Sequence, residues 1–259
     1  MARARKRHLQ QSLRYFDKNG QRRGLSKHKR TGRPPKGERS SERHKKRKTF
    51  KASEPLHVVL RVAKDVMTLR RGRIYQAVRA AMVTMFSREG FRIVHISIQP
   101  NHIHLIIEAN DRMRLARGMQ AFQISAAKHI NAALVGDDGK RRRGCVFTDR
   151  YHAEVIDSPK RARHTLAYVL NNWRHHGEHR QDFARGLPID PFSSADSFDG
   201  WQHFESTPAL REIREVYKSL PVWEPRTWLL YDGWKRHGYV DVREVPGPRP
   251  TKTAVAIAE

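Results

Sequence analysis

The sequence predicts an α+β fold, in which helices pack on an antiparallel-rich sheet, with a basic arm before it and a helical extension after it. Four short stretches rich in β-branched residues are typical of strands, and three longer stretches repeat apolar residues at helical spacing. Their order along the chain is β-α-β-β-α-β-α. We therefore expect a disordered basic arm at 1–53, a folded domain at 54–186 and an accessory region at 187–259.

Turn-forming residues set the expected bounds of these elements. Gly90 ends the first helix, Pro100 and Asn101 separate the second and third strands, and Pro159 suits the first turn of the last helix. The second strand alternates apolar and polar residues with one irregular step. The expected strands are 56–62, 91–99, 102–108 and 145–156, and the expected helices are 73–89, 114–134 and 159–173.

The charge of the chain indicates a polyanionic partner. Its 259 residues include 52 Lys and Arg against 26 Asp and Glu, which gives a formal net charge of +26 and a pI near 11.0. Nucleic acid is the simplest such partner, and binding of a neutral ligand is disfavoured. Residues 1–50 hold 19 of the basic residues and 3 of the acidic ones. They contain too few apolar residues for a core, so we expect a disordered arm.

Cysteine content and hydropathy exclude several classes of protein. Cys145 is the single cysteine, which excludes an internal disulfide framework and a multi-cysteine metal site, and a reducing compartment fits. The basic N-terminus leads into no apolar stretch, and no 18 apolar residues run together. We therefore expect neither a signal peptide nor a membrane span.

Two basic segments are candidate DNA contacts. Residues 29–37 contain a Gly-Arg-Pro core with Arg33 and Lys36, which resembles an AT-hook, an extended segment that lies in a narrow A·T minor groove. The alternative is a basic linker that holds phosphates without preference. In the folded domain, a charged loop is either a phosphate clamp or a solvated turn. Its basic residues are Lys140, Arg141, Arg142 and Arg143.

Two histidines on the third expected strand are candidate metal ligands. Residues two apart in a strand point to the same face, so His102 and His104 share one face while Ile103 and Leu105 pack into the core on the other. Two imidazoles on a rigid sheet can hold a divalent ion. The alternative is a pair of half-exposed strand histidines without a ligand.

The last helix of the domain carries a tyrosine on its expected polar face. The buried face consists of Leu166, Val169, Leu170 and Trp173, and the opposite stripe consists of His164, Tyr168, Asn172 and His175. Beside a metal ion, the Tyr168 hydroxyl is a candidate nucleophile and the Asn172 carbonyl oxygen a candidate ligand. Amide and imidazole ligands with open water positions suit Mg²⁺ or Mn²⁺. The alternative is a tyrosine packed at the edge of the core with a wet hydroxyl.

Four motifs resemble those of the single-tyrosine transposases of the His-hydrophobe-His superfamily, in particular the branch associated with repeated extragenic palindromes. They cover roughly 54–180 in the order of that family. The motifs are QPNHIHLIIE at 99–108, MQAF with IN at 119–131, VFTDRYH at 146–152 and YVLNN at 168–172. Arg150, in the third motif, is a further candidate DNA contact.

The chain departs from the family pattern at two positions. Trp173 follows Asn172 where the family usually has Pro, so the helix is free to continue, and Gln99 replaces the usual Met or Leu. The nucleophile is assigned to Tyr168 and not to Tyr151, because only Tyr168 has a carboxamide four residues later. In the accessory region, residues 191–194 resemble the Trp-Ser-Ser segment that follows the catalytic helix.

The resemblance implies a ferredoxin-like sheet on which His102, His104 and Asn172 hold one Mg²⁺ or Mn²⁺ ion. It also implies that Tyr168 attacks single-stranded DNA, in hairpin or palindromic form, and forms a 5′-phosphotyrosine linkage. A cytoplasmic protein associated with the bacterial nucleoid is expected. The competing class is a non-catalytic nucleic-acid-binding module on the same sheet, and the sequence leaves open whether the protein is a monomer or a homodimer.

Overall fold

The computed structural model describes residues 48–136, 138–182, 184–202 and 218–247. Four strands form one antiparallel sheet in the order β2-β3-β1-β4. The strands are β1 (Leu56–Arg61), β2 (Phe91–Ile98), β3 (His102–Ala109) and β4 (His152–Val155). This order, with helices connecting β1 to β2 and β3 to β4, is the ferredoxin-like arrangement and confirms the expected fold. The arm and its AT-hook lie outside the described residues, apart from the last few positions before the domain.

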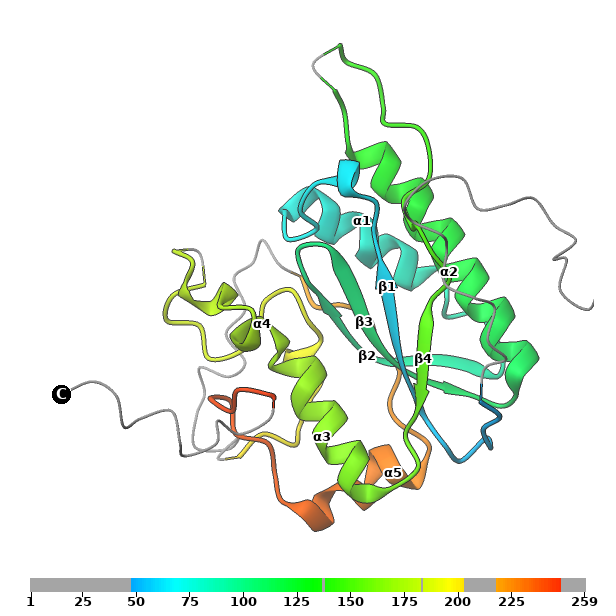
Figure 1. The fold of residues 1–259 in the computed structure, drawn as a ribbon, viewed down its shortest axis with the longest axis vertical. Coiled ribbons are helices and arrows are strands. Elements are labelled where there is room, and N and C mark those ends of the chain that lie inside the picture. Colours follow the sequence, from blue (N-terminus) through cyan, green and yellow to red (C-terminus); the bar gives the residue numbers. More distant parts are fainter. Residues whose placement is uncertain (1–47, 137, 183, 203–217, 248–259) are drawn as a thin grey trace, which may run out of the picture. The chain divides into compact units, whose positions relative to one another are not determined.

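Helices cover both faces of the sheet (Figure 1). On one face lie α1 (Gly72–Val83) and α2 (Arg112–Ala133), and their apolar sides form the main core with the sheet. On the other face lies α3 (Pro159–Leu170), which packs in a second apolar cluster with Val94 and Ile106 of the sheet. β2 and β3 therefore have two buried sides, and side chains between the sheet and α3 are held in a partly enclosed layer.

Successive side chains of β1 and β3 point to opposite faces of the sheet, and this alternation determines which side chains lie in each layer. Leu105 and Ile103 lie opposite Val58 and Leu60 and point into the main core. His104 lies opposite Val59 on the other face, as its position in the strand predicted. The irregular step expected in β2 is confirmed as a register shift between Ile93 and His95.

Three expected bounds were wrong. The first helix ends at Val83, because residues 84–88 continue as turns, with Met85 N donating to Met82 O at 2.9 Å. The last strand is shorter than 145–156. Val59 pairs with His152 and Val62 bridges to Phe147, so the chain from 147 to 152 has two more residues than the chain from 59 to 62, and these residues loop out of the ladder.

The third wrong bound concerns the end of α3. This helix stops at Leu170, since Asn171 leaves the helical conformation with φ −104° and ψ 13°, and a short helix, α4 (Asn172–His175), follows. The side-chain Nδ2 of Asn171 donates to Asp241 O at 2.9 Å, which ties this break to the C-terminal part of the chain. The chain thus runs on after Asn172, but not as one continuous helix.

The described part of the accessory region packs on the domain. Its helical segments are 3₁₀ turns and a short helix, namely Ala195–Ser197, α5 (Trp228–Tyr231) and Gly233–His237. They join α3 in the second apolar cluster. A further 3₁₀ turn, Lys64–Val66, follows β1, and another, Glu178–Arg180, follows α4. No helix among the described residues is long and apolar enough to cross a membrane.

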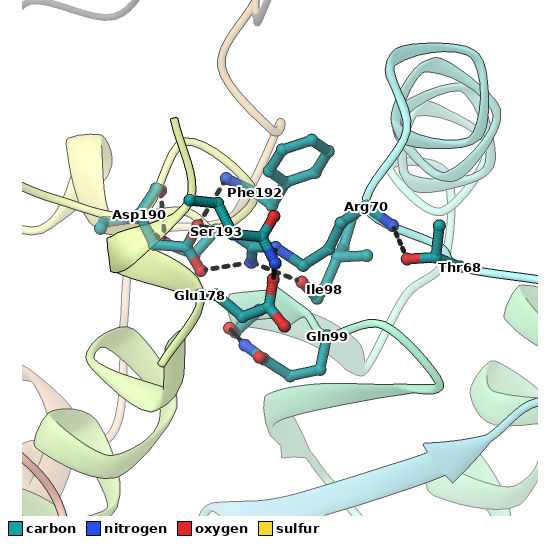
Figure 2. Close-up of polar contacts among 11 residues, drawn as sticks. Thr68, Arg70, Ile98, Gln99, Glu178, Asp190, Phe192 and Ser193 are labelled. Carbon is teal, nitrogen blue, oxygen red and sulfur yellow. Dashed lines mark hydrogen bonds and ion pairs between the residues drawn. The ribbon is translucent and has the colours of Figure 1, made fainter. Parts of the chain in front are cut away.

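A buried ion pair fixes the segment at 190–194 against the outer edge of β2. Figure 2 shows the Arg70 guanidinium between Asp190 and the Ile98 carbonyl; its Nη2 lies 2.8 Å from Asp190 Oδ1, and its Nη1 donates to Ile98 O at 3.0 Å. Ile98 N donates to Phe192 O at 2.8 Å, and Ser194 N donates to Ile96 O at 2.9 Å. The edge of β2 is therefore covered here and does not end in unpaired backbone groups.

Candidate active site

Three histidines lie together on the sheet face that α3 covers. His102 and His104 come from β3, and His57 comes from the neighbouring strand β1, where it pairs with Ile106. Because facing positions two residues apart lie diagonally across an antiparallel pair, His57 reaches His104. His104 is buried, while His57 and His102 are partly exposed.

Short contacts join the three imidazoles in a row. The Nε2 atoms of His102 and His104 lie 2.9 Å apart, and His104 Nδ1 lies 3.0 Å from His57 Nε2. At the other end, His102 Nδ1 lies 2.6 Å from the side-chain oxygen of Asn101. Since that oxygen only accepts, the Nδ1 of His102 carries a proton, and its Nε2 presents a lone pair when the ring is neutral.

Burial keeps these imidazoles neutral. It lowers the pKa of His57 and of His102 to about 4, and that of His104 to about 2. Positive charge on His57 or His176 acts in the same direction on the pKa of both His102 and His104. At neutral pH the row consists of neutral rings, the protonation state in which imidazole binds a metal ion.

Tyr168 lies over this row from the last turn of α3. Its ring makes edge contacts with His104, at 5.3 Å between ring centroids, and with His57, at 5.7 Å. The tyrosine is partly buried, whereas His164, the local imidazole suggested by the sequence, is exposed one turn earlier. The fold therefore brings together Tyr168 and the His-hydrophobe-His pair, two features more than 60 residues apart.

Asn172 does not lie on an exposed polar stripe, as the sequence predicted it would. Its side chain is 0% exposed, because the break at Asn171 begins a new helix and ends the helical spacing from Tyr168. Within the described residues, neither polar atom of the Asn172 side chain has a hydrogen-bond partner. A buried amide without partners costs free energy, so this group is suited to a ligand that the protein itself does not supply.

The donor atoms at this site can be compared with the ligands that a metal ion requires. Within the part of the chain that the structure describes, no group of three or more His, Cys, Asp or Glu side chains is arranged to hold one. The candidate set thus consists of two imidazoles and one amide. Two ligand atoms at right angles on an octahedral ion, each about 2.05 Å from it, lie about 2.9 Å apart, and the two Nε2 atoms have this separation. The two histidines fit such an ion.

The predicted DNA contacts have different surroundings. Lys140, Arg141, Arg143 and Arg150 are exposed, and Lys140 pairs with Asp138 at 3.5 Å. The guanidinium of Arg142 is instead partly buried and lies 2.6 Å from both Asp65 and Asn131. These contacts of Arg142 therefore stabilise the loop. Arg33 and Lys36 lie outside the described residues.

Sequence reasoning missed His57. This residue sits between Leu56 and Val58 in a strand, and its position alone shows that it points away from the main core. The alternation of side chains along the strand indicates the face on which His57 lies. The register between β1 and β3, which brings His57 to His104, depends on tertiary structure and could not be predicted.

Most of this domain matches a family model. Residues 52–172 match the family model described as Transposase IS200 like, and this range includes the whole sheet, Tyr168 and Asn172. This part of the chain is similar to the IS200-like transposases, which confirms the resemblance seen in the sequence.

Two solved structures are similar to the chain. One is the REP-associated tyrosine transposase bound to a REP hairpin, at 16% identity and a TM-score of 0.41, covering 71% of this chain and 96% of that chain. The other is a candidate transposase from Deinococcus radiodurans, at 13% identity and a TM-score of 0.31, covering 55% of this chain and 98% of that chain. None of the curated proteins that were compared matches the chain.

Proposed function

We propose that the protein is a metal-dependent transposase that cuts single-stranded DNA, in hairpin or palindromic form, with Tyr168 as its nucleophile. The observation that carries this proposal is the edge contact of the Tyr168 ring with His104, whose Nε2 lies 2.9 Å from that of His102. A nucleophile and a pair of metal ligands in direct contact are what phosphodiester cleavage requires.

His102, His104 and the carboxamide of Asn172 are the proposed ligands of one Mg²⁺ or Mn²⁺ ion. The separation of the two Nε2 atoms and the unpaired, buried amide of Asn172 support this assignment. When bound, such an ion polarises the scissile phosphate and stabilises the negative charge that develops on it.

The protein's own residues then perform the reaction. The Tyr168 oxygen attacks phosphorus and forms a phosphotyrosine bond to the 5′ end of the downstream fragment, while the bond from phosphorus to the 3′ oxygen of the upstream fragment breaks. The tyrosine proton leaves to water, and the departing 3′ oxygen takes up a proton to become a hydroxyl. The covalent link conserves the free energy of the phosphodiester bond, so strand transfer requires no nucleotide cofactor.

His57 is the proposed positioning residue for His104. For His104 to bind an ion through Nε2, its remaining proton must reside on Nδ1, and a neutral His57 can accept it through its Nε2 at 3.0 Å. A hydrogen bond of this kind fixes both the tautomer and the orientation of a ligand.

Chelation separates this proposal from a non-catalytic nucleic-acid-binding module. A labelled single strand with a hairpin is incubated with the protein in Mn²⁺, and again in excess EDTA, and both cleavage and binding are measured. We expect cleavage in Mn²⁺ only, with binding in both samples because phosphate contacts supply most of the affinity. Binding without cleavage on any hairpin in either sample would favour the module.

A further inference from the structure

An open pocket of about 550 Å³ lies at the far end of the β2–β3 hairpin from the histidines. β3 runs from His102 at the candidate active site to Ala109 beside this pocket, a span of roughly 24 Å at the rise of an antiparallel strand. The lining includes Phe86, Arg88, Arg92, Asn110, Trp223 and Arg226. A second pocket of about 290 Å³ shares Arg88 and adds Arg114 and Arg117. We call these two pockets together the arginine groove.

Two aromatic rings form one wall of the arginine groove. Phe86 and Trp223 are stacked, with centroids 4.2 Å apart and planes 18° from parallel. Trp223 is anchored, since its backbone N–H donates to Ile93 O at 3.0 Å. Phe86 is 49% exposed, although it is a large apolar side chain that could have packed inside. A partly exposed ring that is held flat by a second ring is a stacking platform for a planar group.

The groove is rich in positive charge that the protein does not neutralise. Arg88, Arg114 and Arg117 are exposed and have no acidic partner among the described residues. Arg92 is held rigidly by Glu108, with Nη2 and Oε2 2.8 Å apart. Among the described residues that line the two pockets, Glu89 is the only acidic one. This charge pattern favours an anion, and phosphates in particular, because guanidinium groups match their geometry.

We propose that the arginine groove binds an unpaired segment of nucleic acid, with a base stacked on Phe86 and phosphates held by Arg88, Arg114 and Arg117. Aromatic stacking next to a track of arginines is the physical combination that single-strand binding uses. The inference rests on the proposed function in one respect, namely that DNA is the partner. At roughly 24 Å from the histidines, the groove contacts DNA away from the cut and so contributes affinity, not chemistry.

The test measures binding apart from cleavage. A fluorescent dT12 strand is titrated by anisotropy in EDTA, with the full chain carrying Tyr168→Phe in every sample, so that neither the ion nor the nucleophile affects the result. Two variants probe the groove: Phe86→Ala, and Arg88→Gln with Arg117→Gln. Their matched controls are Tyr231→Ala, an exposed ring on α5, and Arg73→Gln with Arg180→Gln, exposed arginines elsewhere.

We expect Phe86→Ala to weaken binding by about 5- to 150-fold, the effect of losing one base stack. The double arginine variant should flatten the plot of log K against log salt by about 1.4, since each lost contact to a single strand is worth about 0.7. Both controls should bind dT12 as tightly as the Tyr168→Phe chain does. The Arg73 and Arg180 control should flatten the plot of log K against log salt by less than the groove variant does. Because Arg88 and Arg117 are exposed, this variant tests the proposal even if Phe86→Ala disturbs folding.

Groove variants that bind dT12 as tightly as their controls, with the same salt slope, would overturn the proposal. So would tighter competition by an acidic peptide of equal charge than by unlabelled dT12, because the groove would then be a protein-docking surface. These outcomes are independent of the catalytic proposal. Failure of the Tyr168 mechanism would leave the dT12 binding and its dependence on the groove unchanged.

Discussion

The ring of Tyr168 meets the imidazole of His104 edge-on, with centroids 5.3 Å apart and planes at 85°. One residue comes from the last turn of α3 and the other from the middle of β3, so the packing of this helix on the sheet sets their geometry. His104 is buried and lies beside two further histidines, which limits its movement. The contact places the proposed nucleophile directly beside the proposed metal ligands.

The metal site predicts that His102→Ala and His104→Ala each abolish cleavage and leave most of the DNA affinity intact. Each change removes one of two imidazole ligands, while lysine and arginine contacts to phosphate dominate binding. Single-turnover cleavage in Mn²⁺ and anisotropy titration of the same strand measure the two effects. His152→Ala is the control, because this imidazole is exposed on the same face of the sheet. Cleavage at a near wild-type rate by either variant would rule out the site.

The contact between His57 and His104 predicts that His57→Ala lowers Mn²⁺ affinity by about 10- to 100-fold, as expected when the hydrogen-bond partner of a ligand is lost. His57→Gln should recover part of this loss, because a carboxamide can still accept from Nδ1 of His104. Calorimetric Mn²⁺ titration without DNA measures both variants. If His57→Ala bound Mn²⁺ as the wild type does, His57 would have no positioning role.

The buried ion pair of Arg70 and Asp190 predicts a large loss of stability on truncation. In Arg70→Met, Asp190 stays buried without its partner, and we expect the free energy of unfolding to fall by about 3–5 kcal/mol. Urea unfolding followed by circular dichroism measures it. Arg185→Met serves as the comparison, since its pair with Asp182 is exposed and should contribute less than about 1 kcal/mol. Equal stability of the two variants would mean that the buried pair does not fasten residues 190–194.

The order of strands and helices could be predicted from local patterns. β-branched runs, the turn at Pro100 and the capping position of Pro159 depend on neighbours in sequence, and these predictions hold in the structure. The strand at 145–156 could not be delimited in this way. Its length depends on the pairing with β1, where two extra residues leave the ladder before His152.

The candidate site was only partly accessible to sequence reasoning. The shared face of His102 and His104 follows from strand alternation, but the burial of Asn172 does not follow from helical periodicity. The buried face expected for α3 is confirmed, since Leu166, Val169 and Leu170 are buried, whereas Asn172 lies beyond the end of this helix, in α4. The break at Asn171, tied to Asp241, depends on residues 70 positions away.

The most direct test of the mechanism is the covalent intermediate itself. The wild type is incubated with a labelled hairpin strand and Mn²⁺, denatured, and resolved by gel electrophoresis; we expect a denaturant-resistant protein–DNA adduct. Tyr168→Phe removes one oxygen from a partly buried ring and should fold normally but give no adduct, whereas Tyr151→Phe should still give it. An adduct that persists in Tyr168→Phe and disappears in Tyr151→Phe would move the nucleophile to the segment before β4 and contradict the assignment of Tyr168.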